Sequence, residues 1–320
     1  MSYATARQID ADLIPVIDIG PLRDGSGADA VAAALHKASR EVGFLYVANH
    51  GLSQVTLSAA RETALSFFRR AEEEKAGAKV NAKHRGWLAA GGAKMQDDAR
   101  PDLKESFIWG FQDADGHTPE DHPLRGANNW PGFAPELESA AMAWFTGAHE
   151  VAGHLMRGFA LGLGKPEDFF QRTTAKPMSR ASFVYYPPQP PEMGEEQFGV
   201  GPHTDFGVLT VLGQDDVGGL QVQDLNGDWV AAPPIPGTLV VNVGDLLARW
   251  TNDEYRSTPH RVVNASGRER LSLVLAYDPE PETIIDPREV FGWDVETAHE
   301  PITCGDYLEW RFAKAFAYRK

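Results

Sequence analysis

The spacing of hydrophobic positions changes character along the chain. In the first half, apolar residues recur every three or four positions over 29–42, 54–79 and 136–163, which predicts amphipathic helices. Two short apolar runs, 14–19 and 44–48, are typical of strands. We therefore predict a mixed but helix-rich first part, followed by one long helix that braces what comes after it.

From residue 180 to about residue 280 the pattern is that of short strands separated by Pro, Gly, Asn and Asp. No helix-length segment lies between consecutive runs, which disfavours a parallel α/β architecture. Several short strands at this spacing favour a sandwich or barrel. The predicted strands are 182–186, 208–212, 220–223, 229–231, 238–243, 260–263 and 271–276, and a last helix is predicted over 307–318.

Composition limits the chemistry that this chain can perform. Its one cysteine, Cys304, excludes an internal disulfide framework and a cysteine-rich zinc site, so metal ligands must be nitrogen or oxygen atoms. A net charge of −15 without a long basic run argues against nucleic acid as a partner. The apolar runs are too short for a membrane span, and no secretion signal is recognisable. We expect a cytoplasmic protein with no obligate protein partner.

A metal site is suggested by His203 and Asp205, which stand two residues apart in a strand-like segment and so share a face. His260 begins another predicted strand and can supply a third ligand. Two histidines and one carboxylate form the facial triad of non-haem Fe(II) oxygenases, which leaves positions open for a co-substrate and O₂. A bare His-x-Asp pair is also common in polar turns, so the context of His260 carries this hypothesis.

A carboxylate-binding group is predicted ten residues after His260. Alternation within a strand turns Arg270 and Ser272 to one face, where a guanidinium and a hydroxyl can hold a carboxylate. Tyr186, just before Pro187, offers a phenol as a further donor. The alternatives are a salt bridge at the rim of the fold for Arg270 and an ordinary strand aromatic for Tyr186.

Many ordered motifs resemble the isopenicillin N synthase-like branch of the 2-oxoglutarate/Fe(II)-dependent dioxygenase superfamily. The resemblance covers nearly the whole chain. Its motifs include Ile14-Pro15-Val16-Ile17-Asp18, Asn49-His50-Gly51, Arg85-Gly86-Trp87, Lys104-Glu105-Ser106-Phe107, His203-Thr204-Asp205-Phe206-Gly207, Asn242-Val243-Gly244-Asp245 and His260-Arg261-Val262.

The resemblance implies a mainly β fold with flanking helices, in which a distorted double-stranded β-helix, or jelly roll, forms the core. We expect a helix-rich region at 1–120, a bracing helix segment at 121–179, the jelly-roll core at 180–280 and a helical closure at 281–320.

The same resemblance assigns roles to residues. His203, Asp205 and His260 match the Fe(II) ligands. Arg270 and Ser272 match the pair that holds the distal carboxylate of 2-oxoglutarate, and Tyr186 matches a tyrosine that assists them. The implied reaction consumes O₂ and 2-oxoglutarate, releases succinate and CO₂ and oxidises a C–H bond of a small molecule, with ascorbate as a stimulant.

Two other functions stay open from the sequence. One is an oxidase that uses the same iron without 2-oxoglutarate, with Arg270 and Ser272 holding the substrate's own carboxylate. The other is a non-catalytic metal-binding β-sandwich, which a fold resemblance alone permits. The candidate walls of the substrate pocket are Phe183, Phe206, Leu220 and Trp250.

Overall fold

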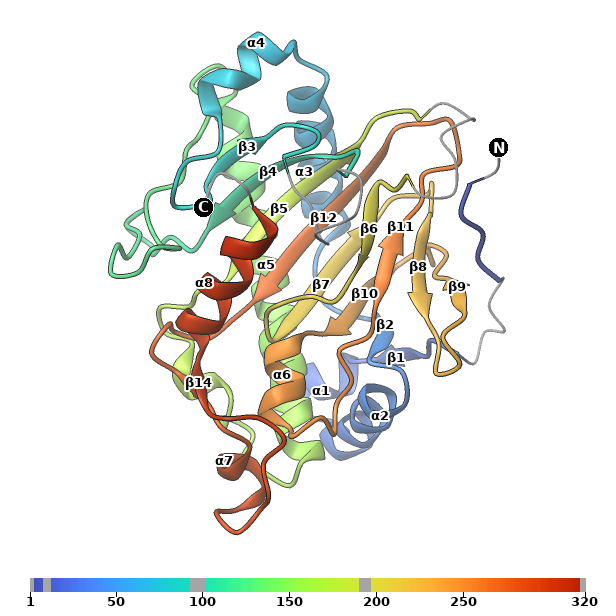
Figure 1. Cartoon of the computed structure of the whole chain (residues 1–320), viewed down its shortest axis with the longest axis vertical. Coiled ribbons are helices and arrows are strands. Elements are labelled where there is room, and N and C mark those ends of the chain that lie inside the picture. Colours follow the sequence, from blue (N-terminus) through green and yellow to red (C-terminus); the bar gives the residue numbers. More distant parts are fainter. Residues whose placement is uncertain (1–2, 8–12, 93–101, 190–196, 317–320) are drawn as a thin grey trace.

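Two β-sheets face each other, and helices cover the outer side of the larger one (Figure 1). The computed structural model describes residues 3–7, 13–92, 102–189 and 197–316. The larger sheet has the strand order β1-β2-β10-β7-β12-β5-β4-β3, and the smaller has the order β6-β11-β8-β9. This stacked arrangement of antiparallel strands is the predicted double-sheet core, carried by an α+β fold.

The larger sheet is antiparallel except at one edge, where β1 and β2 run parallel. Its strands are β1 (Val16–Asp18), β2 (Phe44–Ala48), β3 (Gly86–Leu88), β4 (Glu105–Gly110), β5 (Arg180–Tyr186), β7 (Leu209–Gln214), β10 (Thr238–Val243) and β12 (Arg270–Tyr277). The smaller sheet consists of β6 (Val200–His203), β8 (Leu220–Gln223), β9 (Trp229–Ala231) and β11 (His260–Val262). A separate antiparallel pair joins β13 (Ile284–Ile285) to β14 (Ile302–Thr303).

The helices are mostly short apart from α5, which packs against β7 and β12 of the larger sheet. Within the described ranges, none of them has the length and apolar character that a membrane crossing requires. They are α1 (Gly20–Asp24), α2 (Ala28–Glu41), α3 (Gln54–Phe68), α4 (Glu72–Lys75), α5 (Pro135–Gly162), α6 (Asp245–Trp250), α7 (Pro287–Phe291) and α8 (Cys304–Ala315), with single 3₁₀ turns at η1 (Ala76–Ala78) and η2 (Gln171–Thr173).

Strand β12 shows how alternation along a strand creates both a core and a cavity. Leu271, Leu273 and Leu275 are buried against the helices. Arg270 and Ser272 point the opposite way, into a cavity between the two sheets. Each fully buried leucine contributes roughly 1.5–3 kcal/mol of hydrophobic stabilisation, so a slip of the strand register by one residue is strongly disfavoured.

The N-terminal region contributes more strand than the sequence pattern predicted. Strands β1 to β4 extend both edges of the larger sheet, and β4 pairs with β5 from Glu105 opposite Tyr185 to Gly110 opposite Arg180. The pattern missed β3 and β4 because their buried residues form continuous apolar runs, without the alternation of a half-exposed strand. The division of the chain at residues 120, 179 and 280 stays a prediction.

The helix predicted over 54–79 is wrong in its second half. Helix α3 ends at Phe68, and the chain turns before the short helix α4. This turn brings buried Lys75 back to the sheet, where its ammonium donates hydrogen bonds to the carbonyl of Phe68 and the carboxylate of Glu105. The last predicted helix, 307–318, corresponds to α8, and residues 317 and 318 lie outside the described ranges.

Candidate metal centre

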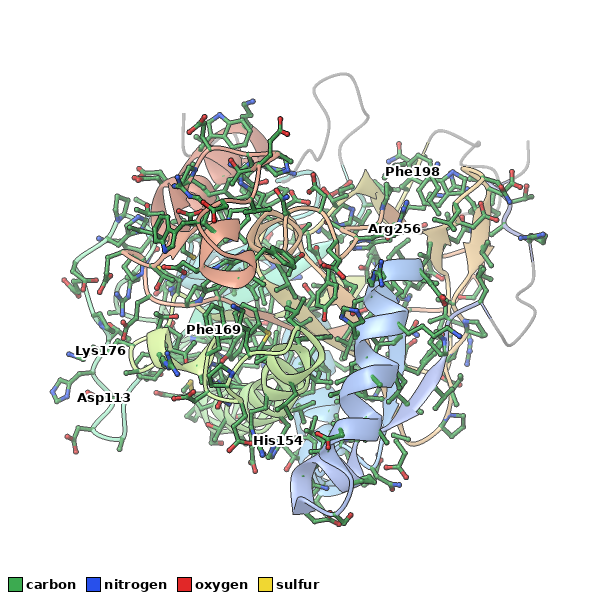
Figure 2. The ribbon with its side chains drawn as sticks, turned by 90° about the horizontal axis from the view of Figure 1, so that it is seen from below. Asp113, His154, Phe169, Lys176, Phe198 and Arg256 are labelled. Carbon is green, nitrogen blue, oxygen red and sulfur yellow. The ribbon has the colours of Figure 1, made fainter. Side chains whose placement is uncertain are left out.

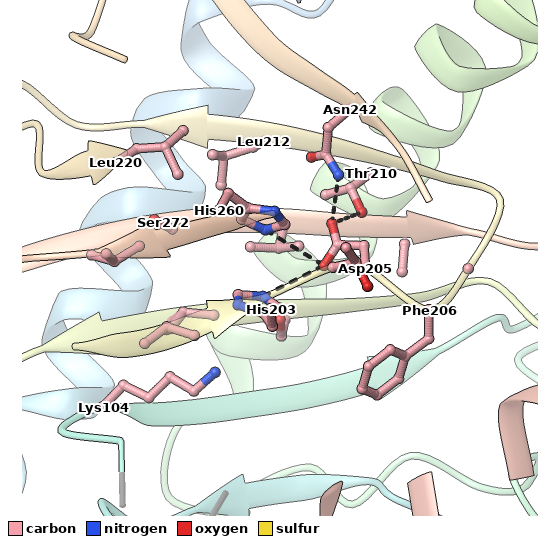
Figure 3. Close-up of a pocket in the computed structure, with 18 of the residues that line it drawn as sticks. Lys104, His203, Asp205, Phe206, Thr210, Leu212, Leu220, Asn242, His260 and Ser272 are labelled. Atoms are coloured by element: carbon pink, nitrogen blue, oxygen red, sulfur yellow. Dashed lines mark hydrogen bonds and ion pairs between the residues drawn. The ribbon is translucent and has the colours of Figure 1, made fainter. Parts of the chain in front are cut away.

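His203, Asp205 and His260 come together at one end of the smaller sheet (Figure 3). His203 ends β6, His260 begins β11, and the two residues are direct antiparallel partners. Oδ1 of Asp205 lies 3.7 Å from Nε2 of each histidine. All three donor atoms lie within 4.8 Å of one another. The 3.7 Å from Oδ1 to each Nε2 is a spacing that two ligand bonds of about 2 Å to one ion can bridge.

Both imidazoles are oriented by backbone carbonyl groups. Nδ1 of His203 lies 2.8 Å from the carbonyl oxygen of Gly201, and Nδ1 of His260 lies 3.2 Å from that of Thr258. A carbonyl oxygen can only accept, so each Nδ1 must carry the hydrogen. In the neutral form of the ring, each Nε2 then carries the lone pair that metal ligation requires.

The carboxylate of Asp205 is held through one oxygen, and its other oxygen is left for an ion. The hydroxyl of Thr210 donates to Oδ2 at 2.6 Å, and the amide of Asn242 donates to the same oxygen at 2.8 Å. Oδ1 therefore faces the two histidines. This arrangement favours a monodentate carboxylate beside two imidazoles, the donor set of a facial triad.

Charge and burial keep His203 and Asp205 in the protonation states that a metal needs. Burial lowers the pKa of His203, and the neighbouring His260 lowers it further, so the imidazole is neutral at neutral pH. Burial by itself raises the pKa of Asp205, but the two histidines and the hydrogen bonds from Asn242 and Thr210 outweigh it, so the pKa is lowered. Neutral imidazoles and an ionised carboxylate are the metal-binding forms.

The loop that carries Asp205 is anchored to the backbone at the start of α6. The backbone N–H of Asp245 donates to the carbonyl of Asp205 at 2.7 Å. At Gly244 the two segments come so close that a Cβ would lie 2.1 Å from the carbonyl oxygen of Gly207. Only glycine fits there, which explains why it precedes Asp245 in the sequence.

Arg270 lies in the same cavity as the triad, whose volume is about 200 Å³. Its side chain is only 1% exposed. Nε donates to the carbonyl of Gly218, and Nη1 donates to the hydroxyl of Ser272 at 2.7 Å. Nη2 has no hydrogen-bond partner among the described residues. A buried N–H without a partner is costly, so this atom is suited to an anionic ligand inside the cavity.

Tyr186 completes this end of the cavity. The guanidinium of Arg270 lies 4.6 Å from the centre of its ring. Burial raises the pKa of the Tyr186 phenol, so the hydroxyl stays protonated and can act as a donor. Arg270, Ser272 and Tyr186 thus lie together as the sequence predicted, with Tyr186 directly opposite Arg270 across β5 and β12.

Two of the four predicted pocket walls are wrong. Phe206 and Leu220 do line the cavity. Phe183 lies on the opposite face of β5 and contacts Trp109 in the helix-covered core, because it is out of phase with Val184 and Tyr186. Trp250, the last residue of α6, packs against Phe170 in the core and does not line the cavity.

The sequence pattern indicated no role for three polar residues of the site. Thr210 and Asn242 hold Asp205, and Lys104 lines the cavity beside the triad. The sequence did single out Asn242, because it is a polar residue within the otherwise apolar run that follows Thr238 in β10. Lys104 stood in a recognised motif, but its position gave no indication of where the ammonium would point.

A second group of potential ligands, Asp113, Asp115 and His117, lies on an exposed loop. Figure 2 shows Asp113 at the edge of the molecule. The carboxylate of Asp113 already accepts hydrogen bonds from the backbone of Asp115 and His117. This pattern is that of an ordinary polar turn, so the triad is the stronger candidate.

Comparison with known proteins agrees with this geometry. The 2OG-Fe(II) oxygenase superfamily matches residues 177–279, and the N-terminal family of non-haem dioxygenases in morphine synthesis matches residues 14–132. A homoarginine-6-hydroxylase of Glycine max is 34% identical over 296 residues, covering 87% of this chain and 89% of the relative.

Solved structures show the same fold. A full-length Neurospora crassa protein, crystallised with alpha-KG and thymine, has a TM-score of 0.84 and 29% identity, covering 96% of this chain and 98% of that one. JOX2, crystallised with 2OG, Fe and JA, has a TM-score of 0.79 and 28% identity, covering 96% and 86%. The chain therefore belongs to the isopenicillin N synthase-like branch of the 2OG-Fe(II) oxygenase superfamily and is a non-haem Fe(II)- and 2-oxoglutarate-dependent dioxygenase.

Proposed function

We propose that His203, Asp205 and His260 hold the Fe(II) of this dioxygenase and that Arg270, Ser272 and Tyr186 hold its 2-oxoglutarate. The donor set supports the first assignment, since two imidazoles and one carboxylate converge within 4.8 Å. The bound iron supplies the oxygen chemistry, in which 2-oxoglutarate is oxidatively decarboxylated to succinate and CO₂ while a substrate C–H bond is hydroxylated.

The observation that carries the second assignment is the unpartnered Nη2 of Arg270. The other two guanidinium nitrogens already donate to Gly218 and Ser272, which fixes the plane of the group. The distal carboxylate of 2-oxoglutarate would accept from Nη2 and from the hydroxyls of Ser272 and Tyr186. The other end of the co-substrate would then reach the triad within the same cavity.

Part of the wall of the cavity that holds Arg270 and the triad is apolar. Phe44, Leu212, Leu220 and Val262 line it. These side chains exclude water from the co-substrate, which strengthens the charge-assisted bonds at Arg270. They also hold the carbon chain of the co-substrate away from other polar groups.

The primary substrate is a small molecule. Several relatives, the Glycine max protein among them, are homoarginine-6-hydroxylases, and two of the solved structures hold thymine or JA. Hydroxylation of a C–H bond is therefore the reaction we propose for this chain, with no nucleic acid and no protein partner required.

Replacement of Arg270 tests the 2-oxoglutarate assignment. Addition of 2-oxoglutarate to the anaerobic Fe(II) protein should produce a visible charge-transfer band, and in air with ascorbate the protein should release succinate slowly. Arg270→Ala should weaken the binding of 2-oxoglutarate by at least about tenfold, because a charge-assisted hydrogen bond contributes about 1.5–3 kcal/mol. Arg270→Lys should recover only part of the affinity, since lysine cannot reproduce the planar fork.

Iron affinity is the control in this experiment, because Arg270 is not a ligand and both variants should bind Fe(II) as the wild type does. If the band and the succinate were both absent in wild-type protein with iron in place, the assignment would be wrong. An oxidase that works without 2-oxoglutarate would then be the better description.

A further inference from the structure

The cavity has a second part that the co-substrate does not need. This part is lined by Lys104, Arg180, Ser182, Phe206 and Phe312. A smaller cavity of about 110 Å³ adjoins it and shares Lys104, Arg180 and Ser182 with it. Because this part of the cavity also borders the triad, a substrate placed here would present its C–H bonds to the metal.

The charges in this part of the cavity are unbalanced. Among the described residues that line the two cavities, Asp205 is the one acid, and its carboxylate belongs to the metal site. Lys104 and Arg180 are cationic. A cavity that offers cations without a free carboxylate favours an anionic ligand and disfavours a cationic group at the same place.

Arg180 does not carry this preference, because its charge is already matched. Nη1 donates to Oδ2 of Asp278 at 2.8 Å, and Asp278 is fully buried. The guanidinium also lies 4.5 Å from the centre of the Phe312 ring. These contacts make Arg180 a part of the wall, held in one orientation.

Lys104 is different, because its ammonium does not form a hydrogen bond with Asp102, the nearest acidic residue. Nζ lies 3.8 Å from Oδ2 of Asp102, which is too far for a hydrogen bond. The Oδ2 atom of Asp102 is itself without a hydrogen-bond partner among the described residues, while Oδ1 accepts from the backbone of Gly201 at 3.0 Å. Burial also raises the pKa of Asp102, which weakens its competition for the ammonium.

The position of Lys104 suits a ligand that reaches the metal. Figure 3 shows the side chain extending beneath His203 toward the cavity. Its side chain is 12% exposed, so an ion pair formed there would be largely shielded from water. Phe206 and Phe312, whose ring centres lie 5.9 Å apart, offer an apolar surface in the same cavity.

We propose that Lys104 anchors a carboxylate of the primary substrate, so that the substrate is a small organic acid or amino acid whose apolar part lies against Phe206 and Phe312. This inference rests on the proposed function, since it requires iron at the triad and 2-oxoglutarate at Arg270. Lys104 is then a specificity-determining residue: it selects the substrate and sets which of its carbons faces the metal.

Matched pairs of ligands test the proposal without turnover. The protein is loaded with Mn(II) and 2-oxoglutarate under anaerobic conditions. Binding of phenylacetic acid, indole-3-acetic acid, jasmonic acid and homoarginine is then measured by calorimetry, each beside its primary amide. At least one acid should bind about tenfold or more tightly than its amide, as expected for one charge-assisted contact. Equal binding of acids and amides, or no binding by any acid, would overturn the proposal.

Variants at Lys104 and at Asp102 should change the affinity for the acid in opposite directions. Lys104→Met should remove the preference for the acid, and Lys104→Arg should keep most of it. Asp102→Asn removes the carboxylate that competes for the ammonium. It should increase the affinity for the carboxylic acid ligand severalfold and leave the affinity for the matching amide unchanged. Should Lys104→Met fail to fold because Asp102 is left buried without a cation, the double variant Lys104→Met with Asp102→Asn keeps the test available. A preference that persists in the variants without the ammonium would contradict the role of Lys104.

Titration with 2-oxoglutarate separates this proposal from the proposed function. Lys104→Met should bind 2-oxoglutarate within about twofold of the wild type and show the same charge-transfer band, whereas Arg270→Ala should not. If Lys104→Met weakened the binding of 2-oxoglutarate as much as Arg270→Ala does, Lys104 would belong to the co-substrate site. The inference about the substrate would then fail. If wild-type protein showed no band at all, the proposed function would fail first.

Discussion

The side-chain amide of Asn242 donates a hydrogen bond of 2.8 Å to Oδ2 of Asp205, across the gap between β10 and the loop after β6. Thr210 in β7 donates to the same oxygen. The two contacts explain why Oδ1 faces the histidines, and they place part of the metal site on the larger sheet. Residues that touch no metal thus orient one that does.

Asn242→Ala and Thr210→Val should therefore weaken the binding of Fe(II). Loss of an outer hydrogen bond to a ligand typically costs about 10- to 100-fold in metal affinity. Anaerobic titration with Fe(II) measures the change. Thr238→Val is the matched control, since Thr238 begins the same strand as Asn242 but its hydroxyl bonds to the carbonyl of Ile235. Wild-type affinity in both site variants would show that Asp205 needs no such support.

One Fe(II) should bind per chain, and Asp205→Ala or His260→Ala should remove it. Loss of a direct ligand should cost more than about 100-fold, beyond the effect of an outer partner. His117→Ala is the control, because His117 belongs to the exposed Asp113 loop. Anaerobic titration gives stoichiometry and affinity together. Unchanged values in both triad variants, or a loss in His117→Ala, would move the metal site elsewhere.

Ser272→Ala and Tyr186→Phe should weaken the binding of 2-oxoglutarate less than Arg270→Ala does. Each removes one neutral hydroxyl, and a neutral hydrogen bond contributes about 0.5–1.5 kcal/mol, or roughly two- to tenfold in affinity. The intensity of the charge-transfer band against 2-oxoglutarate concentration reports the change. Tyr185→Phe is the control, since Tyr185 points to the other face and bonds to Glu269. An effect of Tyr185→Phe equal to that of Tyr186→Phe would count against the assignment.

The chain should unfold in one cooperative transition, because N-terminal and C-terminal strands share the larger sheet. Phe107→Ala in β4 should destabilise the whole chain by about 3–5 kcal/mol, since the side chain is only 1% exposed. Leu225→Ala, at a residue that is 66% exposed, should change stability by less than about 0.5 kcal/mol. Denaturant unfolding measures both. Two separate transitions, one of them shared with an isolated 1–100 fragment, would contradict this expectation.

Local spacing was sufficient to bring together the residues nearest to the chemistry. His203 and Asp205 are two residues apart, and so are Arg270 and Ser272, so each pair could be placed on one face from the period of a strand. His260 was added because it begins another predicted strand, and Tyr186 because it places a phenol at the end of a predicted strand, just before Pro187. The boundaries of β2, β8, β9 and β10 also follow directly from the apolar runs, because each of these strands is short and bounded by turn residues.

Tertiary structure alone decided which strands became neighbours. The pairing of His203 with His260, the meeting of Thr210 and Asn242 at one oxygen of Asp205, and the place of Lys104 beneath His203 all join segments that lie far apart in the sequence or on different strands. Alternation along a strand indicates which face a side chain takes, but it carries no information about the strand beside it. That information comes from burial and backbone pairing across the whole fold, which is why the ligands were predictable and the groups that orient them were not.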